Sequence, residues 1–340
     1  MRKFGIILSA LFCMVLSSCV KETYPDNSNV GNFEALWQLM DEHYCFFDYK
    51  AQEYGLDWNE VHTRYRRQVT NQMPKSGLFE VMCRMLAELR DGHVNLYGNG
   101  DVGRYWSWQE DYPVNFYEHV QDGYLDSDFR ITGGMRYQIL DDNIGYVYYG
   151  DFTGSVSDAS WNLILDYFAF CNGIIIDVRN NGGGYLSNVE KIVSHFTEKR
   201  ILCGYVCHKT GPGHNDFSEW EERWVEPAIA NLRWQKPVAV LTNRGCFSAT
   251  NTFVSDMQVL PQVRTFGDRT GGGGGIPLSV EMPNGWSVRY SSSPMTDAAG
   301  NQIEFGVEPD VKVDITDEDM LRGVDTIIEA ARGWINSFMK

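Results

Sequence analysis

A serine between a predicted buried strand and a predicted helix is the side chain in this sequence best placed for nucleophilic chemistry. Ser248 follows the apolar run Pro237–Thr242 and precedes the helical pattern Ala249–Val259. A hydroxyl at such a junction is held at the edge of a rigid sheet, where the unpaired N–H groups of the helix N-terminus favour negative charge. Serine is also a common helix N-cap, so the junction alone does not separate a nucleophile from a cap.

A second strand-to-helix crossing supplies backbone donors. Asn180–Gly184 contains three consecutive glycines, follows the β-branched run Gly173–Val178 and precedes a predicted helix at Leu186–Phe196. Glycines let backbone N–H groups approach a ligand closely, and acyl transfer uses such donors, each worth ~3 kcal/mol, to hold the oxyanion. A phosphate-binding loop is the alternative, but it lacks the usual lysine and Ser/Thr. The two crossings together predict an acyl-transfer site.

A serine nucleophile requires a base, and His93 is the histidine best placed to act as one. It lies just beyond a predicted helix, in Asp91-Gly92-His93. An imidazole base needs a carboxylate to orient it. Glu304 is one candidate, and Glu308 and Asp268 are others.

The N-terminus predicts export and a lipid anchor. Arg2 and Lys3 precede the apolar run Phe4–Leu16, which is too short to span a bilayer. Leu16-Ser17-Ser18-Cys19 resembles a bacterial lipobox, which predicts a leader over residues 1–18, lipidation at Cys19 and a polar tether over residues 19–31. The alternative is an ordinary signal peptide with an incidental cysteine. Apart from this anchor, no contact with a membrane is expected.

Charge and cysteine content exclude several functions. The net charge is −16 and becomes −18 without Arg2 and Lys3, and no basic stripe opposes it, so nucleic-acid binding is not expected. Cys203, Cys207 and His208 lack a second set of paired ligands, and strand packing is the favoured role for these cysteines. We expect neither a metal nor a cofactor.

The periodicity predicts an α/β fold in two parts. Helical stripes near residues 32–44, 58–69 and 78–89 predict a small helical subdomain over residues 32–95. Alternation of buried strands, glycine-rich turns and helices predicts an α/β core over residues 96–340. Turn signals between residues 276 and 313 predict β-hairpins near the C-terminus, and a last helix is expected over 317–339.

Four segments of the sequence occur in the order Asp177–Gly184, Asn243–Ala249, Gly267–Gly272 and Gly306–Asp310. They resemble motifs that stand in the same order in the C-terminal processing (tail-specific) peptidases. The resemblance covers most of residues 32–315 and implies a ClpP/crotonase-like core with Ser248 as nucleophile. It also implies an oxyanion hole from the Ala249 N–H and a glycine N–H, with Gly184 favoured and Gly183 the neighbouring candidate.

The sequence departs from the bacterial members in two places. They pair their serine with a lysine where this chain has Gly271–Gly275, so a serine–lysine dyad at that place is excluded. The pattern is closer to the tricorn core protease, for which His93 and Glu304 match the histidine and glutamate positions, although Gly92 replaces the serine before the histidine. The stretch between His93 and Ile144 is too short for the usual PDZ domain.

These observations predict a serine-type peptidase of the cell envelope, acting on peptides or proteins. His93 is the expected general base, and an unperturbed imidazole pKa near ~6.5 would leave it neutral at physiological pH. Two alternatives remain open. One is a catalytically silent lipoprotein that binds a ligand or peptide on the same fold, and the other is a hydrolase of non-peptide esters.

Overall fold

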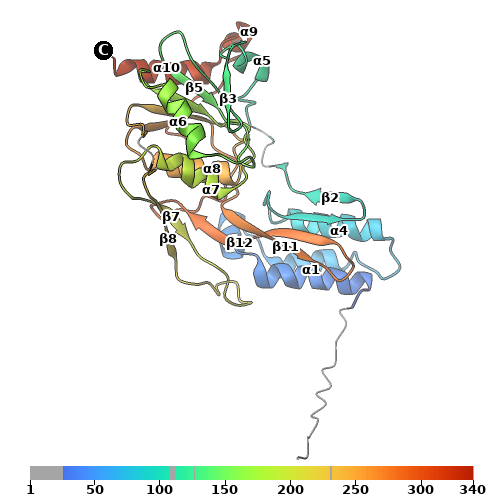
Figure 1. The fold of residues 1–340 in the computed structure, drawn as a ribbon. Coiled ribbons are helices and arrows are strands. Elements are labelled where there is room, and N and C mark those ends of the chain that lie inside the picture. The colour runs from blue at the N-terminus through green and yellow to red at the C-terminus, as the bar shows by residue number, and fades with distance from the viewer. Residues whose placement is uncertain (1–25, 108–109, 111, 126, 230–231, 340) are drawn as a thin grey trace, which may run out of the picture.

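The computed structural model describes residues 26–107, 110, 112–125, 127–229 and 232–339. The predicted leader, Cys19 and most of the predicted tether lie outside these residues. The described chain forms two sheets with helices packed against each of them (Figure 1).

The main sheet has its parallel strands in the centre. In the described chain its order is β13-β10-β9-β6-β5-β4-β3. Strands β5, β6, β9, β10 and β13 are parallel, while β4 pairs antiparallel with both β5 and β3. The bounds are β3 (Arg130–Thr132), β4 (Met135–Ile139), β5 (Gly145–Tyr148), β6 (Ile174–Asp177), β9 (Val238–Thr242), β10 (Val263–Gly267) and β13 (Val311–Lys312).

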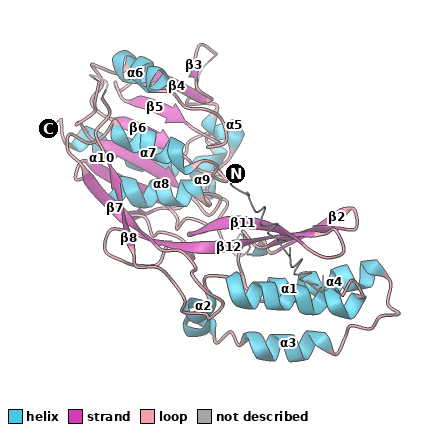
Figure 2. Ribbon diagram, turned by 60° about the horizontal axis from the view of Figure 1, so that its bottom comes forward, coloured by secondary structure: helices cyan, strands magenta, loops and turns pink. Residues whose placement is uncertain are grey.

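Helices cover both faces of the main sheet, which explains its continuous apolar strands. Ile174 and Ile176 face the cluster that includes α6, α7 and α8, whereas Ile175 faces α10 (Figure 2). All residues of β6 and β9 are buried. The bounds are α5 (Glu118–Gln121), α6 (Asp158–Tyr167), α7 (Leu186–Ser194), α8 (Ala249–Gln258), α9 (Asp317–Leu321) and α10 (Thr326–Ser337).

A second sheet connects the N-terminal region to the core. Its order in the described chain is β2-β1-β12-β7-β8, with β11 also paired to β12. The long strand β12 pairs with β1 near its start and with β7 at its end. The bounds are β1 (Asn95–Gly98), β2 (Asp101–Arg104), β7 (Ile201–Val206), β8 (Glu221–Val225), β11 (Gly275–Glu281) and β12 (Ser287–Thr296).

The N-terminal helices pack against one face of this second sheet. Apolar side chains of α1 and α4 share a core cluster with Leu96 of β1 and Val288 of β12, both fully buried. Helices before the predicted boundary at residues 95/96 and strand residues after it therefore contribute to one core, and the domain limits themselves remain predictions. The bounds are α1 (Asn29–His43), α2 (Phe47–Tyr54), α3 (Trp58–Arg66) and α4 (Lys75–Ala87).

The predicted α/β class, N-terminal helices and C-terminal strands are confirmed. Two local differences have physical reasons. Helix α2 was not predicted, since it is short and begins at Phe46 without a side-chain cap. The last helix is interrupted, because Gly323 adopts a φ of +74° between α9 and α10.

Within the described ranges, no helix combines the length and apolar character needed to cross a bilayer. The described cysteines are all unpaired.

Candidate active site

Ser248 occupies a strained turn between the segment after β9 and helix α8. Its backbone has φ +57° and ψ −121°, a combination that L-residues rarely adopt and that costs about 1–3 kcal/mol. Although Ser248 stands at the N-cap position, its side chain makes no capping hydrogen bond. The capping role that the sequence left open is therefore not used, and the hydroxyl is turned toward another partner.

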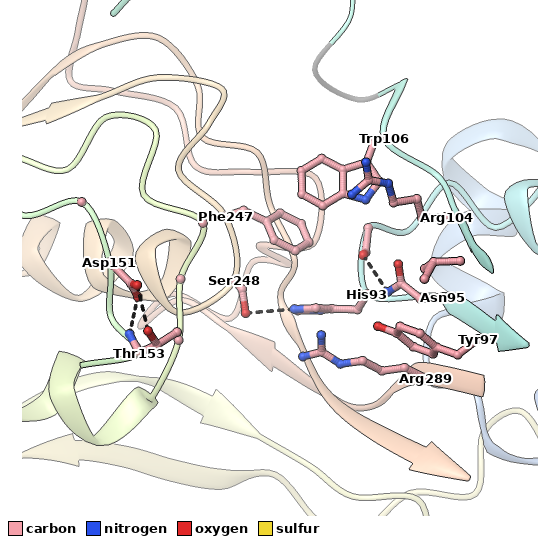
Figure 3. A pocket seen from close by; sticks show the side chains of 16 residues that line it. His93, Asn95, Tyr97, Arg104, Trp106, Asp151, Thr153, Phe247, Ser248 and Arg289 are labelled. Atoms are coloured by element: carbon pink, nitrogen blue, oxygen red, sulfur yellow. Dashed lines mark hydrogen bonds between the residues drawn. The ribbon is translucent and has the colours of Figure 1, made fainter. Parts of the chain in front are cut away.

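That partner is His93. Its Nε2 lies 2.9 Å from the Ser248 Oγ, joining residues 155 positions apart in the chain (Figure 3). The imidazole is 2% exposed and packs against the Phe247 ring, with 4.8 Å between ring centroids. Its Nδ1 is buried and has no hydrogen-bond partner among the described residues. The pairing predicted from sequence is thus formed by a loop after α4 and a turn after β9.

Asp91 is the acid that the structure puts next to His93, and its role was not predicted from sequence. Its Oδ1 accepts the His93 backbone N–H at 2.7 Å, and its Oδ2 accepts hydroxyls from Tyr44 and Ser291, each at 2.9 Å. Burial alone would raise the pKa of Asp91, but Lys50, His93 and these hydrogen bonds outweigh it and lower that pKa. The carboxylate is therefore ionised, and the only sequence signal for it was its place two residues before the histidine.

The environment keeps His93 neutral. Burial lowers the pKa of His93 to about 4, with Asp91 opposing this shift and Arg289 and Lys50 adding to it. The sequence had suggested an unperturbed imidazole. A neutral ring can accept a proton from Ser248, and Asp91 stabilises the imidazolium that results.

Glu304 does not make the predicted contact with His93. Its Oε1 is paired with Lys50 Nζ at 3.0 Å, and its Oε2 accepts the Gly274 N–H at 3.0 Å. Burial raises the pKa of Glu304, Asp91 raises it further, and Lys50 opposes both. The carboxylate is already satisfied by these two donors, so the structure leaves it no hydrogen bond with the imidazole.

The other two candidate acids lie elsewhere. Glu308 is exposed and pairs with Arg269 at 3.4 Å, and the buried Asp268 pairs with Lys312 at 3.5 Å. In the described chain neither carboxylate makes a hydrogen bond with His93.

The glycine loop after β6 contacts the serine turn. A Cβ added at Gly183 would lie 2.9 Å from the Ser248 Cβ and 2.9 Å from the Ala249 nitrogen. The Gly183 N–H already donates to Asn181 Oδ1 at 2.9 Å, so this predicted donor is occupied. In the described chain, neither the Gly184 N–H nor the Ala249 N–H donates a hydrogen bond. Two amides are thus free beside the serine.

A buried ionic network fixes the start of this loop. Arg179 is fully buried and forms ion pairs with Asp177 at 2.6 Å and with Asp325 at 2.8 Å. Asp325 is the N-cap residue of α10. Arg179 precedes Asn180, whose backbone N–H donates to Asn243 Oδ1 at 2.9 Å. The glycine loop is therefore anchored both to the C-terminal helix and to the segment that leads to Ser248.

A cleft of about 670 Å³ opens over the serine and histidine. Figure 3 shows Asp151 and Thr153 on one side of Ser248, and His93, Arg289 and Tyr97 on the other. The Ser248 hydroxyl, the neutral His93 and Gly184 line this cleft, and the free Ala249 amide follows Ser248 directly in the chain. This is the arrangement that acyl transfer requires.

Two family models match the chain. Residues 143–313 match peptidase family S41, and residues 25–87 match the tricorn protease C1 domain. The predicted resemblance to the C-terminal processing peptidases and to the tricorn core is thereby confirmed.

Curated relatives match over the core region. The carboxy-terminal processing protease CtpB of Bacillus subtilis is 28% identical over 142 residues, which are 42% of this chain and 28% of that protein. A carboxy-terminal-processing protease of Bartonella bacilliformis is 21% identical over 181 residues, 53% of this chain and 39% of that protein. These matches span less than half of either relative.

Solved structures match over most of the chain. A candidate peptidase from Parabacteroides merdae is 50% identical, with a TM-score of 0.87, and the match covers 91% of this chain and 97% of that chain. Mature CPAF shares the fold at 13% identity, with a TM-score of 0.69 and coverage of 91% and 96%.

Proposed function

Because the chain belongs to peptidase family S41, we propose that it hydrolyses peptide bonds through an acyl-enzyme on Ser248. The observation that carries the proposal is the 2.9 Å contact between Ser248 Oγ and the neutral His93 Nε2. The absence of a capping bond from the Ser248 side chain supports it further.

The reaction proceeds in two halves. His93 Nε2 accepts the Ser248 proton while Oγ attacks the peptide carbonyl, and the imidazolium then gives that proton to the leaving amine as the C–N bond breaks. In the second half, water loses a proton to His93 and attacks the acyl carbon. The imidazolium then returns the proton to Ser248 Oγ as the bond between Oγ and the acyl carbon breaks, which releases the second fragment. The Gly184 and Ala249 amides are the proposed oxyanion donors, because neither has another acceptor in the part of the chain that the structure describes.

We assign different roles to the two buried acids. Asp91 holds the His93 backbone and stabilises the imidazolium. Glu304 is a positioning residue: it accepts the Gly274 N–H, and its backbone oxygen accepts the Gly273 N–H at 2.9 Å. A Cβ added at Gly273 would lie 3.1 Å from His93 Cε1, so Glu304 fixes the glycine segment that supports the imidazole.

We further propose that the enzyme works in the cell envelope, anchored through Cys19 after removal of residues 1–18. The lipobox-like Leu16–Cys19 supports this. Metabolic labelling with a fatty-acid probe, lost in Cys19→Ala, is the expected result.

Labelling with a fluorophosphonate probe tests the nucleophile directly. Leaderless wild type should be labelled, whereas Ser248→Ala and His93→Ala should not, because the first lacks the nucleophile and the second its base. Ser76→Ala and His119→Ala are matched controls, since both side chains are exposed and lie outside the cleft. A folded wild type that is not labelled near neutral pH would contradict catalysis and favour a binding protein on this fold. Cleavage of esters but not of peptides would favour the alternative of a hydrolase that acts on non-peptide esters.

A further inference from the structure

The sheet wall of the cleft carries two arginines in one row. Asn95 of β1 lies opposite Arg104 of β2 and opposite Arg289 of β12. Directly paired residues of antiparallel strands project from the same face of a sheet. The next pair, Leu96 and Val288, faces the other way, into the core beneath the N-terminal helices. Burial of that apolar face thus directs both arginines into the cleft.

Neither arginine has an ion pair with an acid among the residues that the structure describes. Arg289 is half-buried and has no hydrogen bond or ion pair within the described part of the chain. Arg104 is exposed and lies over the Trp106 ring, with 4.8 Å between its Cζ and the ring centroid (Figure 3). A guanidinium group without an ion pair suits a carboxylate ligand.

The reaction defines which part of a substrate these arginines meet. His93 must deliver a proton to the leaving amine, so the leaving fragment passes beside the imidazole. Arg289 lies on this side, close enough to His93 to act on its charge, while Gly184 lies against Thr153, which Figure 3 shows on the other side of Ser248. The arginines are therefore on the side of the leaving fragment.

We propose that Arg289, with Arg104, selects substrates that carry a carboxylate in the leaving fragment, within a few residues of the cleaved bond. This rests on the proposed peptidase activity. The carboxylate comes either from an Asp or Glu side chain or from the C-terminus of the substrate. A bound carboxylate also offsets the positive charge of Arg289, which favours the imidazolium during the reaction.

The primary test is selectivity. Cleavage sites in a proteome-derived peptide mixture are located by mass spectrometry. Matched peptides are then made with Glu or Gln at each of the first three positions after the cleaved bond, ending in a free carboxylate or an amide. In at least one matched pair, we expect the wild-type kcat/KM to be about 10- to 100-fold higher for the peptide with the carboxylate than for its uncharged counterpart. A preference for Glu over Gln shows that the recognised carboxylate is on a side chain. A preference for the free carboxylate over the amide shows that it is the C-terminus of the substrate.

Variants identify the residues responsible. Arg289→Gln should abolish the preference, Arg104→Gln should reduce it, and Arg289→Lys should keep part of it because charge remains without the bidentate geometry. Arg67→Gln is the matched control, since this exposed arginine lies outside the cleft. The proposal would be overturned if wild type cleaved the two peptides of every matched pair at equal rates. It would also be overturned if Arg289→Gln kept the wild-type preference.

A binding measurement separates this proposal from the peptidase activity. Fluorescein-labelled octapeptide pools, with Glu or Gln fixed at alternate positions and with a free or an amidated C-terminus, are titrated with Ser248→Ala while anisotropy is followed. About tenfold tighter binding of the Glu pools, or of the pools with a free C-terminus, supports carboxylate selection even if wild type cleaves nothing, provided that it is lost when Arg289→Gln is added. Equal binding of all the pools rejects carboxylate selection, even if wild type is an active peptidase.

Discussion

At the scale of the residue, the site depends on how its environment sets the protonation of His93. Burial lowers the pKa of this imidazole, and Arg289 and Lys50 act in the same direction, whereas Asp91 opposes them. The imidazole of His93 is therefore neutral over a wider range of pH than that of a solvated histidine. Its conjugate acid is also stronger, which helps protonation of a leaving amine.

The low pKa predicts activity well below neutral pH. The rate of fluorophosphonate labelling should be half-maximal near pH 4, because His93 has a pKa of about 4, and not near the ~6.5 of a free imidazole. The measurement is the labelling rate between pH 3.5 and 8, in steps of about half a unit.

Folding must be followed at each pH. Between the unfolded pKa of ~6.5 and the folded value of about 4, the unfolded chain binds the histidine proton more readily, so this group costs stability as pH falls. Circular dichroism gives the folded fraction. A half-maximal rate near pH 6.5 in fully folded protein would contradict the burial argument.

At the scale of the element, the Gly271–Gly275 segment forms the wall behind the base. Gly273 has a φ of +81°, and a Cβ there would lie 2.7 Å from the Phe247 ring. Side chains at this position would displace the ring or His93. The glycines that replace the lysine of other family members thus allow the backbone to support the imidazole directly.

A matched pair of glycine variants tests this wall. Gly273→Ala should reduce labelling at least tenfold, since a methyl group forces His93 or Phe247 away from Ser248. Gly285→Ala is the control, because Gly285 has the same φ of +81° but nothing within 4 Å of an added Cβ. Both variants carry backbone strain of about 1 kcal/mol, so a larger loss of stability in Gly273→Ala, measured by thermal unfolding, reports the added contact. Equal labelling by the two variants would mean that the contact is unimportant.

At the scale of the whole molecule, the site joins parts of the chain that are far apart. Lys50 of α2 and Glu304 after β12 are separated by 254 positions and form a buried ion pair, with side-chain exposures of 0% and 2%. Lys50 also donates to the Arg90 carbonyl at 3.2 Å, next to Asp91. The N-terminal helices therefore help to build the site.

A double-variant cycle measures this coupling. Lys50→Met should destabilise the fold by about 3–5 kcal/mol, because Glu304 would be buried without its cation. Adding Glu304→Gln should recover part of that loss, as measured by urea unfolding. A loss in the double variant equal to the sum of the two single losses would show that the pair is not coupled.

Much of this arrangement was predictable from local pattern. Continuous apolar strands at Gly173–Val178 and Pro237–Thr242 required a sheet buried on both faces, and the glycines and serine that follow them had to meet at one sheet edge. Ser248 was selected in this way and His93 from its place just beyond a helix, and their contact agrees with both choices. The short helix α2, with no side-chain cap, left no comparable signal for Lys50.

The sequence by itself determined which residue types stand at the carboxyl ends of the buried strands, because strand burial and turn chemistry are local properties. Only the tertiary structure decided which acid lies next to the histidine. The sequence favoured Glu304 and did not single out Asp91, but Lys50 and Gly274 bind Glu304, while Asp91 holds the His93 backbone. Charge pairing in a buried site depends on distances between segments remote in the chain, and those distances are set by packing.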